Sequence, residues 1–398
     1  MTTTDFPTLR LKPKADARRI RHGAPWVYKD DLVLDRRSRA IAAGAVARLE
    51  DSERAFLDWV AVNPESKIAA RVLDRQPDAT IGSDWIRARI ARALALRNRL
   101  FDTPFYRLVH AEGDGLPGLI VDRFGDLCVV QPNTAWIESV LPDVVSALQS
   151  ELGAQVVLKN ASGRARAMEG LDDASDTVLG TRPDAPLLVR MNGATYLADV
   201  TEGQKTGLFF DQRPNHRFAA SMAKGARVLD VFSHVGGFAL AALAAGAKDA
   251  VAVDASAEAL RLAVEGAEHS GFADQFSTRQ GDAFDVLAAL QSENDRFGLV
   301  VCDPPAFAPH KGALTAGLRA YERIARLAAP LVDEGGTLVL CSCSHAATLE
   351  KFRAACLRGI GRAGREGRLI YTGFAGPDHP QHPYLAETGY LKALAFSL

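Results

Sequence analysis

The sequence lacks the excess of positive charge that marks many proteins bound to nucleic acid. Its 398 residues include 47 Lys and Arg against 48 Asp and Glu, so the formal net charge is -1. A neutral chain has no long-range positive field with which to attract a polyanion. Any contact with nucleic acid must therefore come from a local patch.

Cysteine is also scarce, and long apolar runs are missing. The cysteines are odd in number and unevenly spaced, at Cys128, Cys302, Cys341, Cys343 and Cys356, which argues against a disulfide framework and favours reduced thiols. No run approaches the roughly 20 apolar residues that span a membrane. Met1 to Lys14 carries charges and Pro7 where a signal peptide needs an apolar stretch. We expect a cytoplasmic protein with no membrane association.

The chain is 47% hydrophobic and long enough to bury more than one core. Three successive stretches differ in their residue patterns. Short β-like segments separated by Gly and Pro predict a small β-rich domain over residues 1–75. A helix over Asp84 to Phe105, a turn-rich stretch over Glu112 to Asp126 and later strands predict an α+β domain over 76–188. Residues 189–398 form the third expected domain.

The first stretch contains the local patch that the global charge does not reveal. Between Arg10 and Arg39 there are ten Lys or Arg against four Asp, a local charge of +6. The helix expected from Asp84 adds a row of arginines interleaved with apolar residues. This row fits an ordinary solvated surface equally well.

A regular alternation of strands and helices begins at Arg227. Strands are expected at 227–232, 250–254, 275–280, 298–302 and 336–343, and helices at 236–245, 256–269, 283–290, 316–331 and 346–362. Such alternation predicts an α/β domain with a parallel sheet covered on both faces and ligands at the carboxyl ends of the strands.

A glycine turn and two acids follow successive strands of this domain. Gly236 and Gly237 open the first helix, Asp254 ends the second strand, where it could accept both hydroxyls of a ribose, and Asp282 follows the third, near an adenine amino group. A dehydrogenase would show the same outline, but a pyrophosphate wants a G-x-G-x-x-G turn, which is missing here. S-adenosylmethionine has no phosphate, so the turn favours a methyltransferase. The expected cofactor contacts of these turns are Asp230, Phe232, Ser233, His234, Val235, Gly236, Gly237, Asp254, Ala255, Ser256, Asp282, Ala283 and Phe284.

The fourth strand ends in Asp303-Pro304-Pro305-Ala306-Phe307, which forms a rigid cradle for a planar ring beside the cofactor. Asp303 and Pro305 are also expected to contact the cofactor. The fifth strand ends near Cys343. Carbon 5 of a pyrimidine is a poor nucleophile, and a thiolate added to carbon 6 activates it. We therefore expect Cys343 and Asp303 to be catalytic, with Asp303 holding a protonated ring N3. Buried cysteine often serves only packing, and zinc bound by Cys341, Cys343 and His345 is a further alternative, although the expected site holds no metal.

At these residues the chain resembles the bacterial ribosomal RNA large-subunit methyltransferase I (RlmI-type) family, nearly end to end. The resemblance rests on motifs at Gly23–Tyr28, Glu112–Arg123, Gly203–Arg213, Asp303–Phe307, Ser342–His345 and Asp378–Pro380. It implies an N-terminal PUA β-barrel that binds RNA, a central α+β domain and a class I, Rossmann-like methyltransferase domain with a mainly parallel seven-stranded sheet. It further implies 5-methylcytidine formation in large-subunit ribosomal RNA, a homodimer, and cofactor or substrate contacts from Lys205, Phe210 and Gln212.

Two positions depart from related enzymes. The family usually has Tyr and Thr where this chain has His234 and Val235, which affects side-chain contacts to the methionine moiety. Many RNA cytosine-C5 methyltransferases outside the family carry a second cysteine where this chain has Pro305, so another base must remove the carbon-5 proton. Two rival hypotheses stay open, namely methylation of another base atom such as guanine N7, and a non-catalytic RNA-binding assembly factor.

Overall fold

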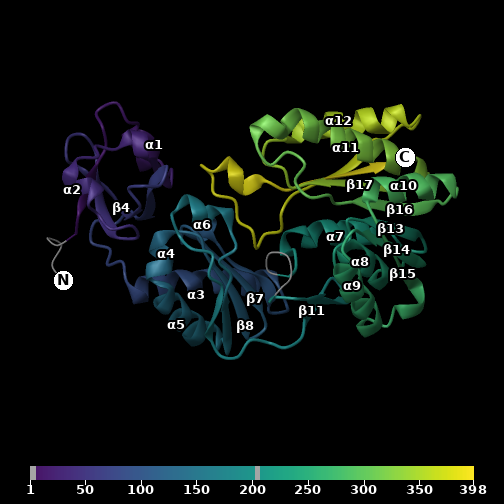
Figure 1. Cartoon of the computed structure of the whole chain (residues 1–398), viewed down its shortest axis with the longest axis horizontal. Coiled ribbons are helices and arrows are strands. Elements are labelled where there is room, and N and C mark those ends of the chain that lie inside the picture. Colours follow the sequence, from purple (N-terminus) through teal and green to yellow (C-terminus); the bar gives the residue numbers. More distant parts are fainter. Residues whose placement is uncertain (1–5, 202–206) are drawn as a thin grey trace. The chain divides into compact units, whose positions relative to one another are not determined.

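The computed structural model describes residues 6–201 and 207–398 (Figure 1). The predicted contact residue Lys205 lies outside the described residues. The chain forms two compact units. The first comprises Met1–Asp184 and Asp378–Thr388, and the second comprises Ala185–Pro377 and Gly389–Leu398. Among the described helices, none is long and apolar enough to cross a membrane.

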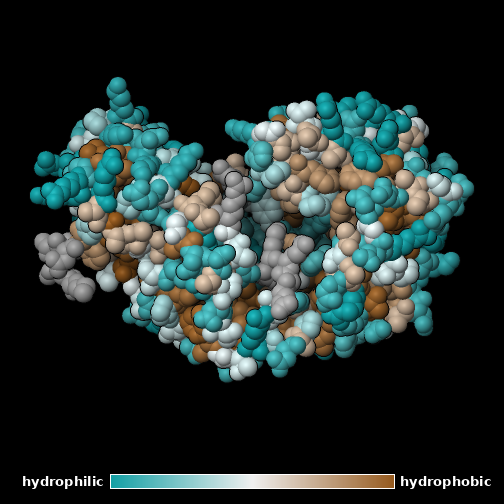
Figure 2. All heavy atoms as spheres, viewed as in Figure 1, coloured by the Kyte–Doolittle hydropathy of each residue, from teal (hydrophilic) through white to brown (hydrophobic). Residues whose placement is uncertain are grey.

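The first unit begins with a five-stranded sheet. Its spatial order is β1-β3-β4-β5-β2, with bounds β1 Thr8–Arg10, β2 Trp26–Tyr28, β3 Val46–Glu50, β4 Phe56–Val62 and β5 Ile68–Asp74. Alternating side chains of β3 fill a core with Leu9 and Val60. Two short helices, α1 (Ala17–Arg21) and α2 (Arg36–Arg39), begin where Asp16 and Asp35 accept backbone N–H groups. Figure 2 shows hydrophilic side chains projecting from this part of the chain.

A second five-stranded sheet follows in the same unit, in the order β10-β9-β8-β7-β6. Its elements are α3 Ser83–Leu100, β6 Phe105–His110, β7 Leu119–Phe124, β8 Leu127–Pro132, α4 Ala135–Ser139, α5 Leu141–Leu152, β9 Val156–Lys159, α6 Arg164–Met168 and β10 Asp176–Leu179. The helix expected to reach Phe105 ends at Leu100, because Pro104 can neither donate a backbone hydrogen bond nor follow a helical residue easily. Strand β7 lies inside the stretch predicted to be turn-rich.

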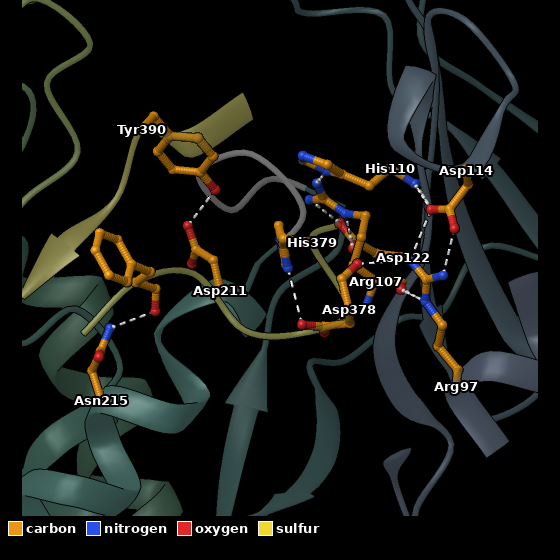
Figure 3. Close-up of polar contacts among 11 residues, drawn as sticks. Arg97, Arg107, His110, Asp114, Asp122, Asp211, Asn215, Asp378, His379 and Tyr390 are labelled. Carbon is orange, nitrogen blue, oxygen red and sulfur yellow. Dashed lines mark hydrogen bonds and ion pairs between the residues drawn. The ribbon is translucent and has the colours of Figure 1, made fainter. Parts of the chain in front are cut away.

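The segment Asp378–Thr388 joins this unit through buried charges (Figure 3). The Arg97 guanidinium is fully buried, pairs with Asp114 at 2.6 Å and donates to the Asp378 carbonyl at 2.8 Å. The Arg107 backbone N–H donates to Asp378 Oδ2 at 3.1 Å. Every charge in this set has a partner, as burial demands.

The second unit opens with the hairpin β11 (Leu187–Met191) and β12 (Ala194–Ala198). A seven-stranded sheet follows in the order β15-β14-β13-β16-β17-β19-β18, in which only β19 pairs antiparallel to its neighbours. The strands are β13 Arg227–Val231, β14 Asp249–Asp254, β15 Phe276–Gln280, β16 Phe297–Cys302, β17 Val332–Ser342, β18 Arg368–Gly373 and β19 Lys392–Ser397. The predicted α/β class and mainly parallel seven-stranded sheet are confirmed.

Helices cover both faces of this sheet, with α8 and α9 on one side and α10 to α12 on the other (Figure 1). The helices are α7 Arg213–Ser221, α8 Gly237–Ala244, α9 Ala257–His269, α10 Ala283–Ser292, α11 Leu314–Ala328 and α12 Leu349–Arg362. The ends of these elements lie within a few residues of the predicted ones, except that β17 begins four residues earlier. Buried strands such as β16 carry apolar side chains on both faces. The carboxyl ends of β13, β14, β16 and β17 therefore meet at one edge.

Candidate active site

The turn between β13 and α8 has a strained backbone. Phe232, His234 and Gly236 have positive φ angles of 64°, 50° and 79°. Only glycine adopts such angles freely, and strained residues of other types cluster at ligand-binding sites. The His234 N–H donates to Asp254 Oδ2 at 2.9 Å, so the end of β14 holds this turn.

Two polar atoms beneath the turn are buried and lack a hydrogen-bond partner among the described residues. They are Asp230 Oδ1 and Ser233 Oγ. The other Asp230 oxygen accepts the N–H groups of Phe238 and Ala239, at 3.2 and 2.9 Å, and so caps α8. Burial raises the pKa of Asp230 to about 7, with a contribution from Asp254. Unsatisfied buried atoms are rare in proteins and fit a site that a polar ligand completes.

Gly237 has a packing role that the sequence does not reveal. A Cβ atom at this position would lie 2.8 Å from His216 Nε2. The His216 ring is buried against Phe238, with ring centroids 4.4 Å apart, and burial lowers its pKa to about 3. Gly236 supplies the left-handed conformation, whereas Gly237 makes room for a neutral histidine.

Asp254 is the last residue of β14, and Asp282 lies between β15 and α10. Asp254 Oδ1 accepts the Ser256 N–H at 2.9 Å, and Asp282 Oδ1 accepts the Phe284 N–H at 2.9 Å as the cap of α10. Phe284 packs near Phe307, with centroids 6.3 Å apart. The other predicted contacts on these turns are Val235, Ala255 and Ala283. Each carboxylate keeps lone pairs that could accept further hydrogen bonds.

Asp303 is held by a relay of buried amides. Gln212 Nε2 donates to Asp303 Oδ2 at 2.9 Å, Asn215 Nδ2 donates to Gln212 Oε1 at 2.6 Å, and the Tyr371 hydroxyl donates to Asn215 Oδ1 at 3.1 Å. Phe210, also predicted, is buried two residues before Gln212 in the short helix Phe210–Gln212. Sequence reasoning selected Gln212 but missed Asn215 and Tyr371. The relay fixes the carboxylate at the end of β16.

Cys343 is the one partly exposed thiol of the five, since the other four are buried. It follows β17 directly, and its Sγ lies 4.0 Å from the Pro304 carbonyl oxygen, so the structure brings it against the Asp303–Pro305 cradle. Burial raises the pKa of the Cys302 and Cys341 thiols, which keeps them protonated. Pro305 is exposed. Among the described residues no group of His, Cys, Asp and Glu could hold a metal ion.

Both neighbours of Cys343 are fastened to other elements. The Ser342 hydroxyl donates to the Tyr321 hydroxyl at 2.8 Å, and the Tyr321 and Ser344 hydroxyls lie 2.7 Å apart. The Ala308 N–H donates to Ser344 Oγ at 2.9 Å, which ties the cradle to the cysteine segment. Sequence reasoning missed Tyr321, because nothing in an amphipathic helix distinguishes it from a core residue.

Comparison with known proteins places these features in a family. A curated ribosomal RNA large subunit methyltransferase from Deinococcus radiodurans is 33% identical over 98% of this chain and 97% of its own length. Ribosomal RNA large subunit methyltransferase I from Erwinia tasmaniensis is 34% identical over 91% of this chain and 96% of its own. The chain belongs to the ribosomal RNA large subunit methyltransferase family.

Family models agree with this membership. An S-adenosylmethionine-dependent methyltransferase model matches residues 152–358, and a PUA-like domain model matches residues 9–75. A putative S-adenosylmethionine-dependent methyltransferase from Streptococcus mutans shares the fold at 17% identity, with a TM-score of 0.81 over 98% of this chain and all of its own. A putative methyltransferase solved with S-adenosylhomocysteine has a TM-score of 0.82 over 98% of this chain and all of its own.

The protein is therefore an enzyme that uses S-adenosylmethionine, and the dehydrogenase hypothesis is set aside. The residues present fit this cofactor. The unsatisfied Asp230 Oδ1 and Ser233 Oγ could accept hydrogen bonds from polar groups of the cofactor, such as its ammonium group. Asp254 and Asp282 offer hydrogen-bond acceptors to the adenosyl part.

Proposed function

We propose that the protein methylates carbon 5 of a cytosine in large-subunit ribosomal RNA through a covalent adduct at Cys343. The observation that carries this proposal is the partly exposed Cys343 thiol beside the Pro304 carbonyl, where all other thiols are buried. A ring nitrogen such as guanine N7 is already nucleophilic and needs no thiol. The names of the curated relatives support large-subunit ribosomal RNA as the substrate.

Cys343 and Asp303 divide the chemical work. The Cys343 thiolate adds to carbon 6 of the ring, so that electron density collects at carbon 5. S-adenosylmethionine supplies an electrophilic methyl group. Loss of the carbon-5 proton and expulsion of the thiolate then restore the ring. Because a buried Cys302 precedes Asp303 and Pro305 follows Pro304, the thiol pair found in many other RNA cytosine-C5 enzymes is not formed here.

Asp303 selects and stabilises the base. A carboxylate only accepts hydrogen bonds, so it suits the amino group of cytosine and the N3–H that forms in the adduct. Gln212 occupies one Asp303 oxygen and orients the other. A uracil would present its own acceptor oxygen in place of the amino group, which disfavours it.

We also propose that the N-terminal region contacts the RNA. Several basic side chains of its patch are exposed, at Lys12, Lys14, Arg18, Arg21, Arg36, Arg37 and Arg39. Phosphate contacts of this kind supply affinity without reading the sequence. The target base must leave its stack to reach Cys343.

The division into domains at 1–75, 76–188 and 189–398 is a proposal supported by the separate sheets of the first two parts. These two parts share a hydrophobic cluster that joins Trp59 and Leu73 to Ile86. A homodimer and a cytoplasmic site of action are likewise proposed. Free thiols at five positions suit a reducing compartment. Light scattering of the purified chain tests the dimer, and a monomer at micromolar concentration would contradict it.

The decisive experiment compares Cys343→Ala with Cys341→Ala. Unmodified ribosomal RNA is incubated with each protein and labelled cofactor, and the labelled nucleoside is identified. We expect 5-methylcytidine from the wild type and Cys341→Ala, and none from Cys343→Ala. Methylated guanine would support the N7 alternative, and cofactor binding without turnover on any RNA would support the assembly-factor alternative.

A further inference from the structure

Lys392 is a buried charge within an apolar strand. It begins β19, between Leu391 and Ala393, and is 5% exposed. Lysine is almost never buried without a partner, because removing an ammonium from water is costly. Its position therefore requires an explanation that the cofactor site does not supply.

The Lys392 ammonium binds the chain directly after Cys343. Its Nζ donates to the Ser344 carbonyl at 2.7 Å and to the Ala347 carbonyl at 2.9 Å. Antiparallel pairing places Lys392 opposite Ser342 on β17. Two of its three N–H groups therefore close the turn that presents the thiol.

The ammonium and the thiol also interact through their charges. Burial lowers the pKa of Lys392 to about 8, and its proximity to Cys343 acts in the opposite direction. The described neighbours Tyr321 and Asp303 supply no positive charge. Burial raises the pKa of Tyr321 to about 12, so the phenol is neutral. The Asp303 carboxylate precedes Pro304, whose carbonyl oxygen lies 4.0 Å from Cys343 Sγ, and a negative charge there disfavours a second one. Cys341 stays a neutral thiol.

We propose that Lys392 is a positioning residue that holds the Cys343 turn and stabilises the Cys343 thiolate with its positive charge. The inference rests on the proposed function, in which that thiolate attacks the ring. The thiol proton leaves to solvent, and Lys392 stays protonated at neutral pH, which is below its pKa of about 8. When the thiolate is expelled at the end of the reaction, the same ammonium faces it again.

The test is the pH dependence of Cys343 alkylation by iodoacetamide, resolved by peptide mass spectrometry in the absence of RNA. Lys392→Met should raise the midpoint of the Cys343 profile by about one pH unit, which slows alkylation about tenfold at neutral pH. Lys392→Gln keeps a hydrogen-bond donor without the charge and should show the same shift. Lys351→Met, which removes an exposed lysine of α12, should leave the midpoint unchanged.

Several results would overturn this role. A purely structural lysine would change the alkylation rate at every pH without moving the midpoint. A Lys392→Gln midpoint equal to that of the wild type would remove charge as the cause. If neither variant folds, the wild type alone decides, since a Cys343 midpoint at or above the ordinary value of about 8.5 contradicts a stabilised thiolate.

Failure of this inference is separable from failure of the proposed function. An unmoved midpoint together with Cys343-dependent 5-methylcytidine overturns only the role of Lys392. A shifted midpoint together with a methyl group on another base atom overturns only the proposed reaction.

Discussion

Replacing Gly237 with alanine tests whether this glycine serves packing or cofactor approach. The new Cβ would lie 2.8 Å from Nε2 and 2.9 Å from Cε1 of His216, whereas ordinary van der Waals contact begins at 3.4 Å, so an atom must shift. The ring cannot move freely, because it is 4% exposed and packs against Phe238. Overpacking of this kind costs about 1–3 kcal/mol, and alanine returns up to about 1 kcal/mol of helix propensity. We expect a net loss of about 1–2 kcal/mol.

The assay must report on the second unit. All four tryptophans, at 26, 59, 85 and 136, lie in the first unit, so unfolding of the second is better followed by hydrogen exchange of amides in β13 and α8. Gly361→Ala is the matched control, because a Cβ there meets nothing within 4 Å inside α12. It should stabilise by roughly 0.5–1 kcal/mol.

A double-mutant cycle completes this test. In a His216→Ala background the Gly237→Ala change should cost little, which gives a coupling energy of about 1–3 kcal/mol. The packing explanation is refuted if Gly237→Ala weakens S-adenosylmethionine binding at unchanged stability and His216→Ala gives no relief.

Three further predictions concern buried polar groups. Tyr321→Phe should cost about 1–3 kcal/mol of stability by removing the buried hydroxyl that bonds to Ser342 and Ser344 and should lower turnover, as measured by urea unfolding and methyl transfer. Burial raises the folded-state pKa of Asp230 to about 7, so its contribution to stability is complete below pH 4 and is lost as the pH rises through 7. The melting temperature of cofactor-free Asp230→Asn should therefore fall less between pH 5 and 8 than that of the wild type. Arg97→Met should destabilise the first unit by about 3–5 kcal/mol, because Asp114 then remains buried without its cation, whereas a loss below about 1 kcal/mol in tryptophan-detected unfolding would contradict the burial of this pair.

Local patterns were sufficient to predict the sheet that carries the site. Short apolar runs bounded by Gly and Asp identified β13 to β16, because strands buried on both faces need no alternation. Strand β7 was missed because the residues just before it are typical of turns, namely Gly113, Gly115, Pro117 and Gly118. The strand nevertheless forms, since Val121 and Phe124 are buried in the core of the first unit.

The residues around the thiol were predictable only in part. Cys343 and Asp303 lie at or just after the ends of predicted strands, so their sequence context indicates that they lie at the site. Tyr321 and Lys392 bond to residues beside Cys343 from a helix and from a strand distant in sequence, and such contacts depend on tertiary packing. A charge inside the apolar strand β19 was the one available signal for Lys392, because a buried lysine needs partners.

Trapping the adduct tests the central claim most directly. The protein is incubated with S-adenosylmethionine and large-subunit ribosomal RNA in which cytosine is replaced by 5-fluorocytosine, whose carbon-5 fluorine cannot leave as a proton does. A Cys343 thiolate mechanism predicts a stable protein–RNA complex whose digest shows the nucleotide attached to the peptide containing Cys343. A digest in which that peptide is unmodified while methyl transfer to unsubstituted RNA proceeds would contradict the account.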